Sequence, residues 1–250
     1  PKIVCRVVLT EDAPVRYRLK ETANGTFEFY FDGGKWKETS ARTFQTLLRS
    51  IIQGAKGHQL GSVALELKPS DFPKLVPYGE AWFWRTVAEN VLLASYEFTR
   101  YKSKHNTATL EEVILCGVTT KSAKEAALRG VLIANAVNDI RTIANTTGAD
   151  MGPKNLVAAA KKLAAGTGIR VTVHGEAKLK QLKMGLLLGV GKGASEGPCL
   201  LVMEYRKSGN TKAKPTILIG KGVTYDTGGL NLKPTGGLHE MHMDMSGAAA

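Results

Sequence analysis

The sequence has few cysteines and no long apolar run. Its 250 residues include only Cys5, Cys116 and Cys199, an odd number spread far apart. This excludes a disulfide framework and is typical of reduced thiols in an intracellular compartment. No run of eighteen apolar residues occurs, and the N-terminus lacks a charged-then-apolar signal pattern, so neither a membrane span nor secretion is predicted. We therefore expect a cytoplasmic protein with no membrane partner.

Several catalytic motifs are also missing. No serine stands in a G-x-S-x-G context, which argues against a nucleophile elbow. In His239-Glu240-Met241-His242 the histidines are three apart, whereas the zinc-protease helix needs four. Gly189 to Gly193 has its third glycine misplaced for a dinucleotide fingerprint, and we interpret it as a turn. The sequence shows no internal repeat.

Acidic residues are scarce relative to basic ones, and the formal net charge is +12. After residue 120 the chain holds 18 basic and 9 acidic residues. Such a charge is common in proteins that bind nucleic acid or anionic surfaces. The lysines in this half are spread over several predicted elements without interleaved aromatics, so a solvated face is the better interpretation. A basic nucleic-acid- or partner-binding protein with the same fold stays as the alternative function.

Hydrophobic spacing predicts an alternation of strands and helices. Ser40 can cap a helix whose apolar residues between 44 and 52 lie on one face, and 62–67 reads as a strand. A long helix is predicted over 78–101 and a strand over 112–118. These elements form a first α/β unit, with a domain boundary near residue 120.

The second half repeats the alternation. An alanine-rich helix is predicted from Ser122 to Ile143 and packs closely, and Pro153 suits the first position of a helix to Ala165. The remaining predicted elements are strand 170–174, a short helix ending at Met184, and strands 200–205 and 216–220. We therefore predict an α/β fold in which a helix-covered mixed sheet is largely parallel. Its predicted parts are an N-terminal domain (1–120), a connecting helix and loop (121–148) and a second α/β part (149–250).

One glycine-rich stretch at the end of the chain carries the chemistry. After the apolar run 216–220 come Lys221 and Asp226, and then Lys233 and Asp244. Carboxylates in a glycine-lined place at a strand's carboxyl end suit a divalent cation. A lysine can join them only as the neutral amine, with its pKa lowered by burial or by the metal.

This stretch, GKGVTYDTGG followed by LKP and DMSGAAA, closely resembles the signature of the leucyl aminopeptidase family, the two-metal cytosol aminopeptidases. Similar stretches extend from about Tyr96 to Ala250 and include MGLLLGVGKGASEGPCLLVMEY. The resemblance implies a metal-dependent aminopeptidase that releases N-terminal residues, leucine-type, from peptides by two-metal hydrolysis.

The resemblance also implies residue roles. Lys221, Asp226 and Asp244 would be metal ligands, with Asp226 reaching both ions. Lys233 would be catalytic and would stabilise the developing oxyanion. Met241 would line the pocket for the first substrate side chain, although an ordinary core methionine explains it equally well. The cofactors would be two divalent ions, Zn or Mn, with Mg and Co also compatible. Peptides would be the substrates, and the intact protein would be a homo-hexamer.

Two departures from the family pattern affect these expectations. The family's NxPxN turn reads Asn145-Thr146-Thr147-Gly148-Ala149 here, without its proline. The family's later NTDAEGR-type segment, which supplies an Asp, a Glu and an Arg to the site, has no match. The sequence therefore predicts a C-terminally truncated fragment that is inactive alone.

Overall fold

The computed structural model describes residues 5–11, 17–24, 26–103, 110–206 and 214–250. The chain divides into two compact units, residues 1–138 and 139–250. The division falls inside helix α3 (Lys121–Asn145), within the segment that the sequence predicts as the connector. In the described part of the chain, no helix is both long and apolar enough to cross a membrane.

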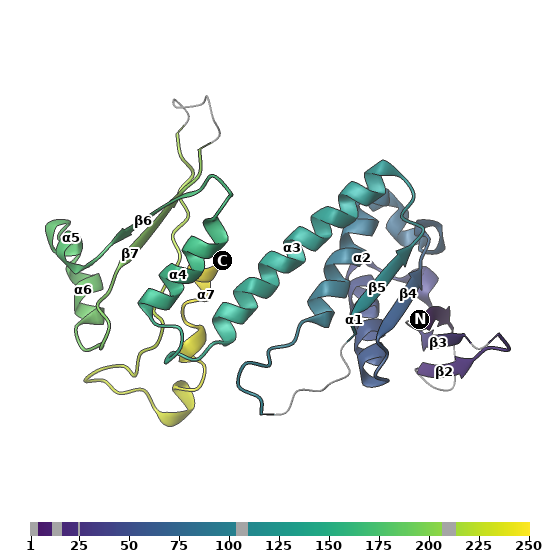
Figure 1. The fold of residues 1–250 in the computed structure, drawn as a ribbon, viewed down its shortest axis with the longest axis horizontal. Helices are drawn as coiled ribbons and strands as arrows, with labels where there is room; N and C mark the ends of the chain where they lie inside the picture. Colours follow the sequence, from purple (N-terminus) through teal and green to yellow (C-terminus); the bar gives the residue numbers. More distant parts are fainter. Residues whose placement is uncertain (1–4, 12–16, 25, 104–109, 207–213) are drawn as a thin grey trace. The chain divides into compact units, whose positions relative to one another are not determined.

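Unit 1 is built on a five-stranded sheet (Figure 1). Its strands are β1 (Cys5–Thr10), β2 (Tyr17–Glu21), β3 (Phe27–Asp32), β4 (Ser62–Glu66) and β5 (Glu112–Cys116), in the order β2-β3-β1-β4-β5. Only β2 is antiparallel to its neighbour. Helices α1 (Ala41–Gly57) and α2 (Gly79–Ser95) connect β3 to β4 and β4 to β5. The predicted α/β class with a mixed, mostly parallel sheet is therefore confirmed.

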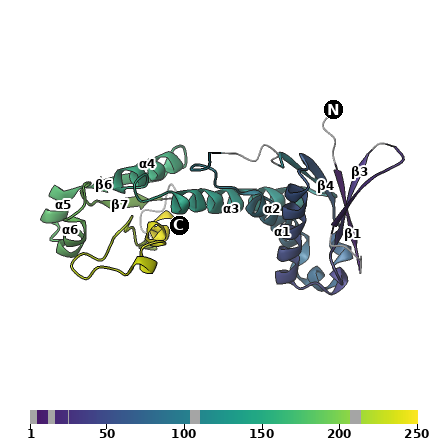
Figure 2. The ribbon, with the colours of Figure 1, turned by 90° about the horizontal axis from the view of Figure 1, so that it is seen from below.

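The core of unit 1 lies between the sheet and these two helices, which stand on the same side of the strands (Figure 2). Alternate residues of β3, Phe29 and Phe31, are fully buried on that face. The rings of Phe44, Phe72 and Phe83 pack against one another with centroids 4.8–5.7 Å apart, and only the Phe44–Phe83 pair is stacked. Alternation on one sheet face and helical spacing on α1 thus build one hydrophobic cluster.

Helix α3 approaches α2 closely, as its alanine content predicts. A Cβ added at Gly130 would lie 2.3 Å from the Arg85 carbonyl oxygen. Ala123, Ala126 and Ala134 are buried on the same helix. Small residues therefore let the two helix backbones come together.

Helix α1 begins with the predicted cap. The Thr43 amide donates to Ser40 Oγ at 3.3 Å, and the Ser40 amide donates to Thr43 Oγ1 at 3.2 Å. This reciprocal pair forms a capping box that satisfies two amides at the helix start. The capping box thereby fixes the residue at which α1 begins.

Ser40→Ala should lower the stability of unit 1 by about 1 kcal/mol, since the Thr43 amide loses its acceptor, Ser40 Oγ. Urea unfolding followed by tryptophan fluorescence can measure this, because all three tryptophans lie before residue 85. Arg42→Ala changes an exposed residue of the same turn and should move stability by less than about 0.5 kcal/mol. Equal stability of Ser40→Ala and wild type would contradict the cap.

Two features of unit 1 differ from the sequence expectation. Helix α2 ends at Ser95, because Tyr96 adopts an extended conformation (φ −58°, ψ 134°), so the predicted helix over 96–101 is wrong. The strands β1, β2 and β3 were not predicted. All five residues of β2 are exposed, which leaves no buried alternation to detect.

Unit 2 contains α4 (Pro153–Ala164), β6 (Arg170–His174), α5 (Glu176–Gln181), α6 (Gly185–Gly191), β7 (Leu200–Glu204) and α7 (Ser246–Ala249). Strands β6 and β7 pair antiparallel. A small buried cluster of Ile143, Met151 and Met245 joins the end of α3 to the start of α7. This cluster fixes the last residues of the chain against the rest of unit 2.

Two predictions for unit 2 are wrong. Residues 216–220 form no strand, and Ile217, Leu218 and Ile219 are 75–93% exposed, because no neighbouring strand among the described residues pairs with them. Gly189 to Gly193 is not simply a turn, since α6 runs to Gly191. Helix α6 therefore continues through Gly189 and ends at Gly191.

Candidate metal centre

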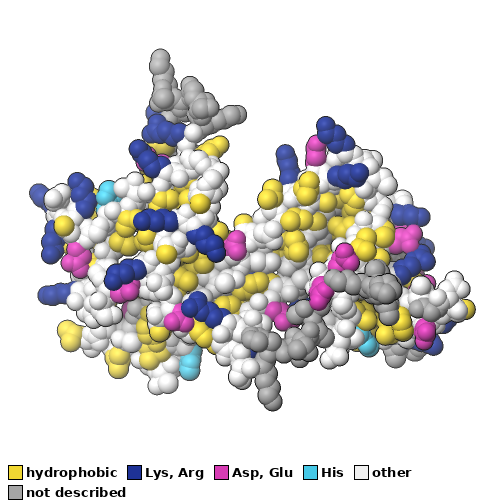
Figure 3. All heavy atoms as spheres, in the orientation of Figure 1, with side chains coloured by type: hydrophobic (Ala, Val, Ile, Leu, Met, Phe, Trp, Pro, Cys, Tyr) yellow, Lys and Arg dark blue, Asp and Glu magenta, His cyan; other side chains and the backbone are white. Residues whose placement is uncertain are grey.

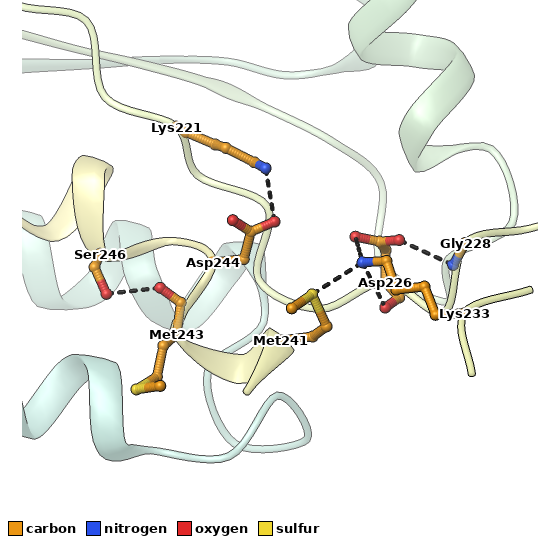
Figure 4. Close-up of polar contacts among 8 residues, drawn as sticks. All are labelled: Lys221, Asp226, Gly228, Lys233, Met241, Met243, Asp244 and Ser246. Atoms are coloured by element: carbon orange, nitrogen blue, oxygen red, sulfur yellow. Dashed lines mark hydrogen bonds and ion pairs between the residues drawn. The ribbon is translucent and has the colours of Figure 1, made fainter. Parts of the chain in front are cut away.

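The four residues singled out by the sequence lie on three neighbouring segments of unit 2 (Figure 4). Lys221 and Asp226 belong to an irregular stretch, and Lys233 follows a turn within it. Asp244 ends the short 3₁₀ helix η5 (Met241–Met243), two residues before α7. Met245, which is fully buried, anchors this last segment.

Lys221 and Asp244 face each other. Lys221 Nζ lies 2.7 Å from Asp244 Oδ2, with the lysine side chain 62% exposed and the aspartate 26% exposed. Beside this pair the Ala248 amide donates to the Lys221 carbonyl oxygen at 3.0 Å. Two residues separated by 23 positions are therefore brought within direct contact.

Asp226 and Lys233 form a second pair across a glycine turn. Lys233 Nζ donates to Asp226 Oδ2 at 2.9 Å, and the Gly228 amide donates to Asp226 Oδ1 at 2.9 Å. The Lys233 amide closes the turn on the Thr227 carbonyl oxygen at 2.8 Å. Gly228 (φ +98°) and Gly229 (φ +71°) adopt the left-handed conformations that this turn requires.

The hydrogen bond from Lys233 lowers the pKa of Asp226, and the Gly228 amide and the charge of Lys221 act in the same direction. Because the pKa of Asp226 is lower in the folded state, its ionised carboxylate stabilises the turn at pH values above the usual pKa of an aspartate. This contribution is lost as the pH falls through the lowered value. Asp226 is thus held as an anion in the absence of a metal.

Gly228→Ala should open the Asp226–Lys233 turn. A Cβ there would lie 2.2 Å from the Asn231 carbonyl oxygen, and φ +98° is strained for any other residue. Because Lys233 then leaves the carboxylate, the pKa of Asp226 should rise towards its ordinary value, as measured by carbonyl NMR titration. Gly236→Ala, whose new Cβ would meet no atom within 4 Å and whose φ is not positive, serves as the control. An unchanged Asp226 pKa in Gly228→Ala would argue against this role of the turn.

Met241 contacts the second pair, with its Sδ 2.9 Å from Lys233 Nζ. A pocket of about 430 Å³ lies nearby and is lined by Thr147, Gly148, Tyr225, Thr235, Leu238, His239 and His242. Met241 is not among these residues, so its role against a substrate side chain stays a prediction. The pocket residue Tyr225 was not singled out from the sequence, where only its position beside Asp226 marks it, and His242 was considered only as part of the histidine motif.

The turn that lacks the family's proline has a defined path. Helix α3 ends at Asn145, and the amides of Asp150 and Met151 donate to the Thr147 carbonyl oxygen at 2.9 Å. Gly148 lies against Tyr225, since a Cβ at this glycine would be 2.8 Å from the tyrosine Cβ. The loop therefore reaches the candidate centre through Tyr225.

The histidine motif does not form a separate site. His242 Nδ1 lies 3.0 Å from the His239 carbonyl oxygen, to which it donates, so the two side chains do not converge on an ion through these atoms. Within the described ranges, no group of three His, Cys, Asp or Glu side chains is placed to hold a metal.

Lys221, Asp226 and Asp244 would supply donors that suit a divalent cation, namely a neutral amine and two carboxylates. The ion pair between Lys221 Nζ and Asp244 Oδ2, 2.7 Å long, brings two of these donors together. Each carboxylate already binds one cation, the ammonium of a lysine. Both places are therefore electrostatically suited to positive charge.

Comparison with known proteins gives consistent results over most of the chain. The N-terminal domain of the cytosol aminopeptidase family matches residues 33–105, and the family's catalytic domain matches residues 138–250. A probable cytosol aminopeptidase of Chlorobaculum tepidum is 34% identical over 223 residues, covering 84% of this chain and 44% of that protein.

Solved structures share the fold. The bottromycin maturation enzyme BotP in complex with Mn superimposes with a TM-score of 0.76 at 26% identity, covering 99% of this chain and 54% of its own. The cytosol aminopeptidase of Coxiella burnetii has a TM-score of 0.74 at 21% identity, covering 100% of this chain and 54% of that one. The chain thus spans about half the length of the proteins it matches.

Proposed function

The chain belongs to the cytosol aminopeptidase family, and we propose that it forms part of a metal-dependent aminopeptidase that releases N-terminal residues, leucine-type, from peptides. The observation that carries the proposal is the pairing of Lys221 with Asp244 and of Lys233 with Asp226 on adjacent segments. These are the residues of the family signature. The contact within each pair supports ordered site residues over four unrelated surface charges.

Two divalent cations are the proposed cofactors. Lys221, Asp226 and Asp244 would hold them, with Lys221 as the neutral amine. The Mn complex of BotP supports manganese, and zinc, magnesium and cobalt also suit this donor set. Such ions, when bound, polarise the scissile carbonyl and lower the pKa of water.

Lys233 has a different task. Its ammonium is partly buried at 29% exposure and is oriented by the carboxylate and backbone oxygens of Asp226 and by the Met241 sulfur. A donor held in this way needs little reorganisation to meet a carbonyl oxygen as negative charge develops on it. We assign Lys233 to that oxyanion and keep Met241 as the neighbour of the first substrate side chain.

Metal content and peptide cleavage test the proposal together. The whole gene product, whether or not it extends beyond these 250 residues, should retain stoichiometric Mn²⁺ or Zn²⁺ after dialysis, measured by elemental analysis. With added Mn²⁺ it should cleave leucine p-nitroanilide. A protein that binds neither metal would overturn the assignment.

The alternative, a basic nucleic-acid- or partner-binding protein, has less support. Lysine and arginine side chains are dispersed among apolar and uncharged ones on the face seen in Figure 3. Several carry acidic partners, such as Arg170 with Glu204 and Lys180 with Glu176. A gel shift that weakens steeply with salt would favour this alternative.

We further propose a homo-hexamer in the cytoplasm for the intact protein, following the family resemblance and the name of its relatives. Sedimentation of the whole gene product tests the assembly. A monomer at micromolar concentration would contradict it.

A further inference from the structure

The backbone of Gly220 crosses the start of α7 at direct contact. A Cβ added at Gly220 would lie 2.2 Å from the Gly247 carbonyl oxygen and 2.6 Å from the Ala248 Cα. No side chain can shift to make room, because both obstructing atoms belong to the backbone. Only glycine at position 220 permits this approach.

The residues that follow Gly220 and Gly247 in the chain also contact each other. The Ala248 amide donates to the Lys221 carbonyl oxygen at 3.0 Å, and a Cβ at Gly247 would lie 3.2 Å from the Lys221 nitrogen. Gly222 also contacts this place, since its Cβ would be 3.3 Å from the Ala248 Cβ. Three glycines therefore surround the backbone of Lys221.

The crossing matters because residues 216–220 form no strand that could fix Lys221. Asp244, in contrast, is fixed by the buried neighbour Met245. Because buried Met245 holds the start of α7 in place, the contact between Gly220 and Gly247 also holds the backbone of Lys221 in place. The 2.7 Å pair of Lys221 and Asp244 is the result.

We propose that Gly220 is a positioning residue that sets Lys221 against Asp244 before a metal binds, with Gly247 as its counterpart. The inference rests on the proposed function insofar as this pair holds the cation. The geometry itself is a property of the metal-free chain. Pre-organised ligands bind a metal more tightly because less ordering remains to be done.

Gly220→Ala in the full chain should separate the two segments. Mn²⁺ affinity, measured by titration with EPR detection, should fall about 10- to 100-fold, the range for changes that misorient metal ligands. In the metal-free protein, the Ala248 amide should lose the Lys221 carbonyl oxygen and keep only that of Met245 as acceptor, so its protection from hydrogen exchange should fall. Gly236→Ala, which meets no atom within 4 Å, should match wild type in both measurements.

The outcomes separate the two proposals. Wild type that fails to bind Mn²⁺ counts against the proposed function, while Ala248 protection still tests the crossing. Gly220→Ala with wild-type affinity and protection overturns the crossing. If that variant leaves unit 2 unfolded, the milder Gly222→Ala decides: an affinity loss of about threefold supports the crossing, and unchanged affinity overturns it.

Discussion

Asp226→Ala is expected to remove stoichiometric metal from the protein. Asp226 is the carboxylate assigned to both cations, and its two oxygens are already oriented by Lys233 and the Gly228 amide. Residues that merely orient a ligand cost about 10- to 100-fold in metal affinity, so loss of a shared ligand should exceed about 100-fold. Elemental analysis after dialysis against Mn²⁺, together with a binding titration, measures the effect.

Two variants control this experiment. Asp226→Asn keeps the shape of the side chain but removes its charge, and it should also lose the metal, which separates charge from packing. Glu240→Ala removes an exposed carboxylate close in sequence to Asp244 and should keep wild-type metal content. Retained stoichiometric metal in both Asp226 variants would refute the ligand assignment.

Lys233→Met should lower kcat by about 10²- to 10³-fold, the cost of deleting one oxyanion donor. In excess Mn²⁺ the metal content should stay stoichiometric, because Lys233 is not assigned as a ligand. The Mn²⁺ affinity should fall by about 10- to 100-fold, since Lys233 orients Asp226. The KM for leucine p-nitroanilide should change little, since the lost contact strengthens only in the transition state. Steady-state kinetics of the whole gene product provide both constants.

Lys192→Met is a suitable control, because Lys192 is exposed just after α6. It should leave kcat unchanged. A Lys233→Met protein with kcat within a few-fold of wild type would exclude the oxyanion role. Loss of metal from that variant even in excess Mn²⁺ would instead place Lys233 among the ligands.

Much of the fold follows from local sequence signals. Ser40 and the apolar spacing of α1 define that helix, and Pro153 marks the start of α4. The signal fails where a segment depends on distant partners. Residues 216–220 have an ideal apolar, β-branched pattern, but a strand also needs a hydrogen-bonded neighbour, which local propensity cannot supply.

The candidate site shows the same division. Residue types and the family signature identified Lys221, Asp226, Lys233 and Asp244. Which lysine meets which carboxylate could not be read from spacing, because the Gly220 crossing and the Gly228 turn decide it. The crossing and the turn are both contacts between backbone atoms, so glycine is the one residue type in the sequence that indicates them.

The exposed run Ile217-Leu218-Ile219 has a practical consequence. An apolar segment outside any sheet, with little charge of its own, offers a template on which other chains can assemble as cross-β ladders. In concentrated solution, aggregation of the 250-residue chain would begin at this segment. Leu218→Lys would place a charge in this segment that opposes such assembly, and it would leave the four residues of the candidate centre unchanged.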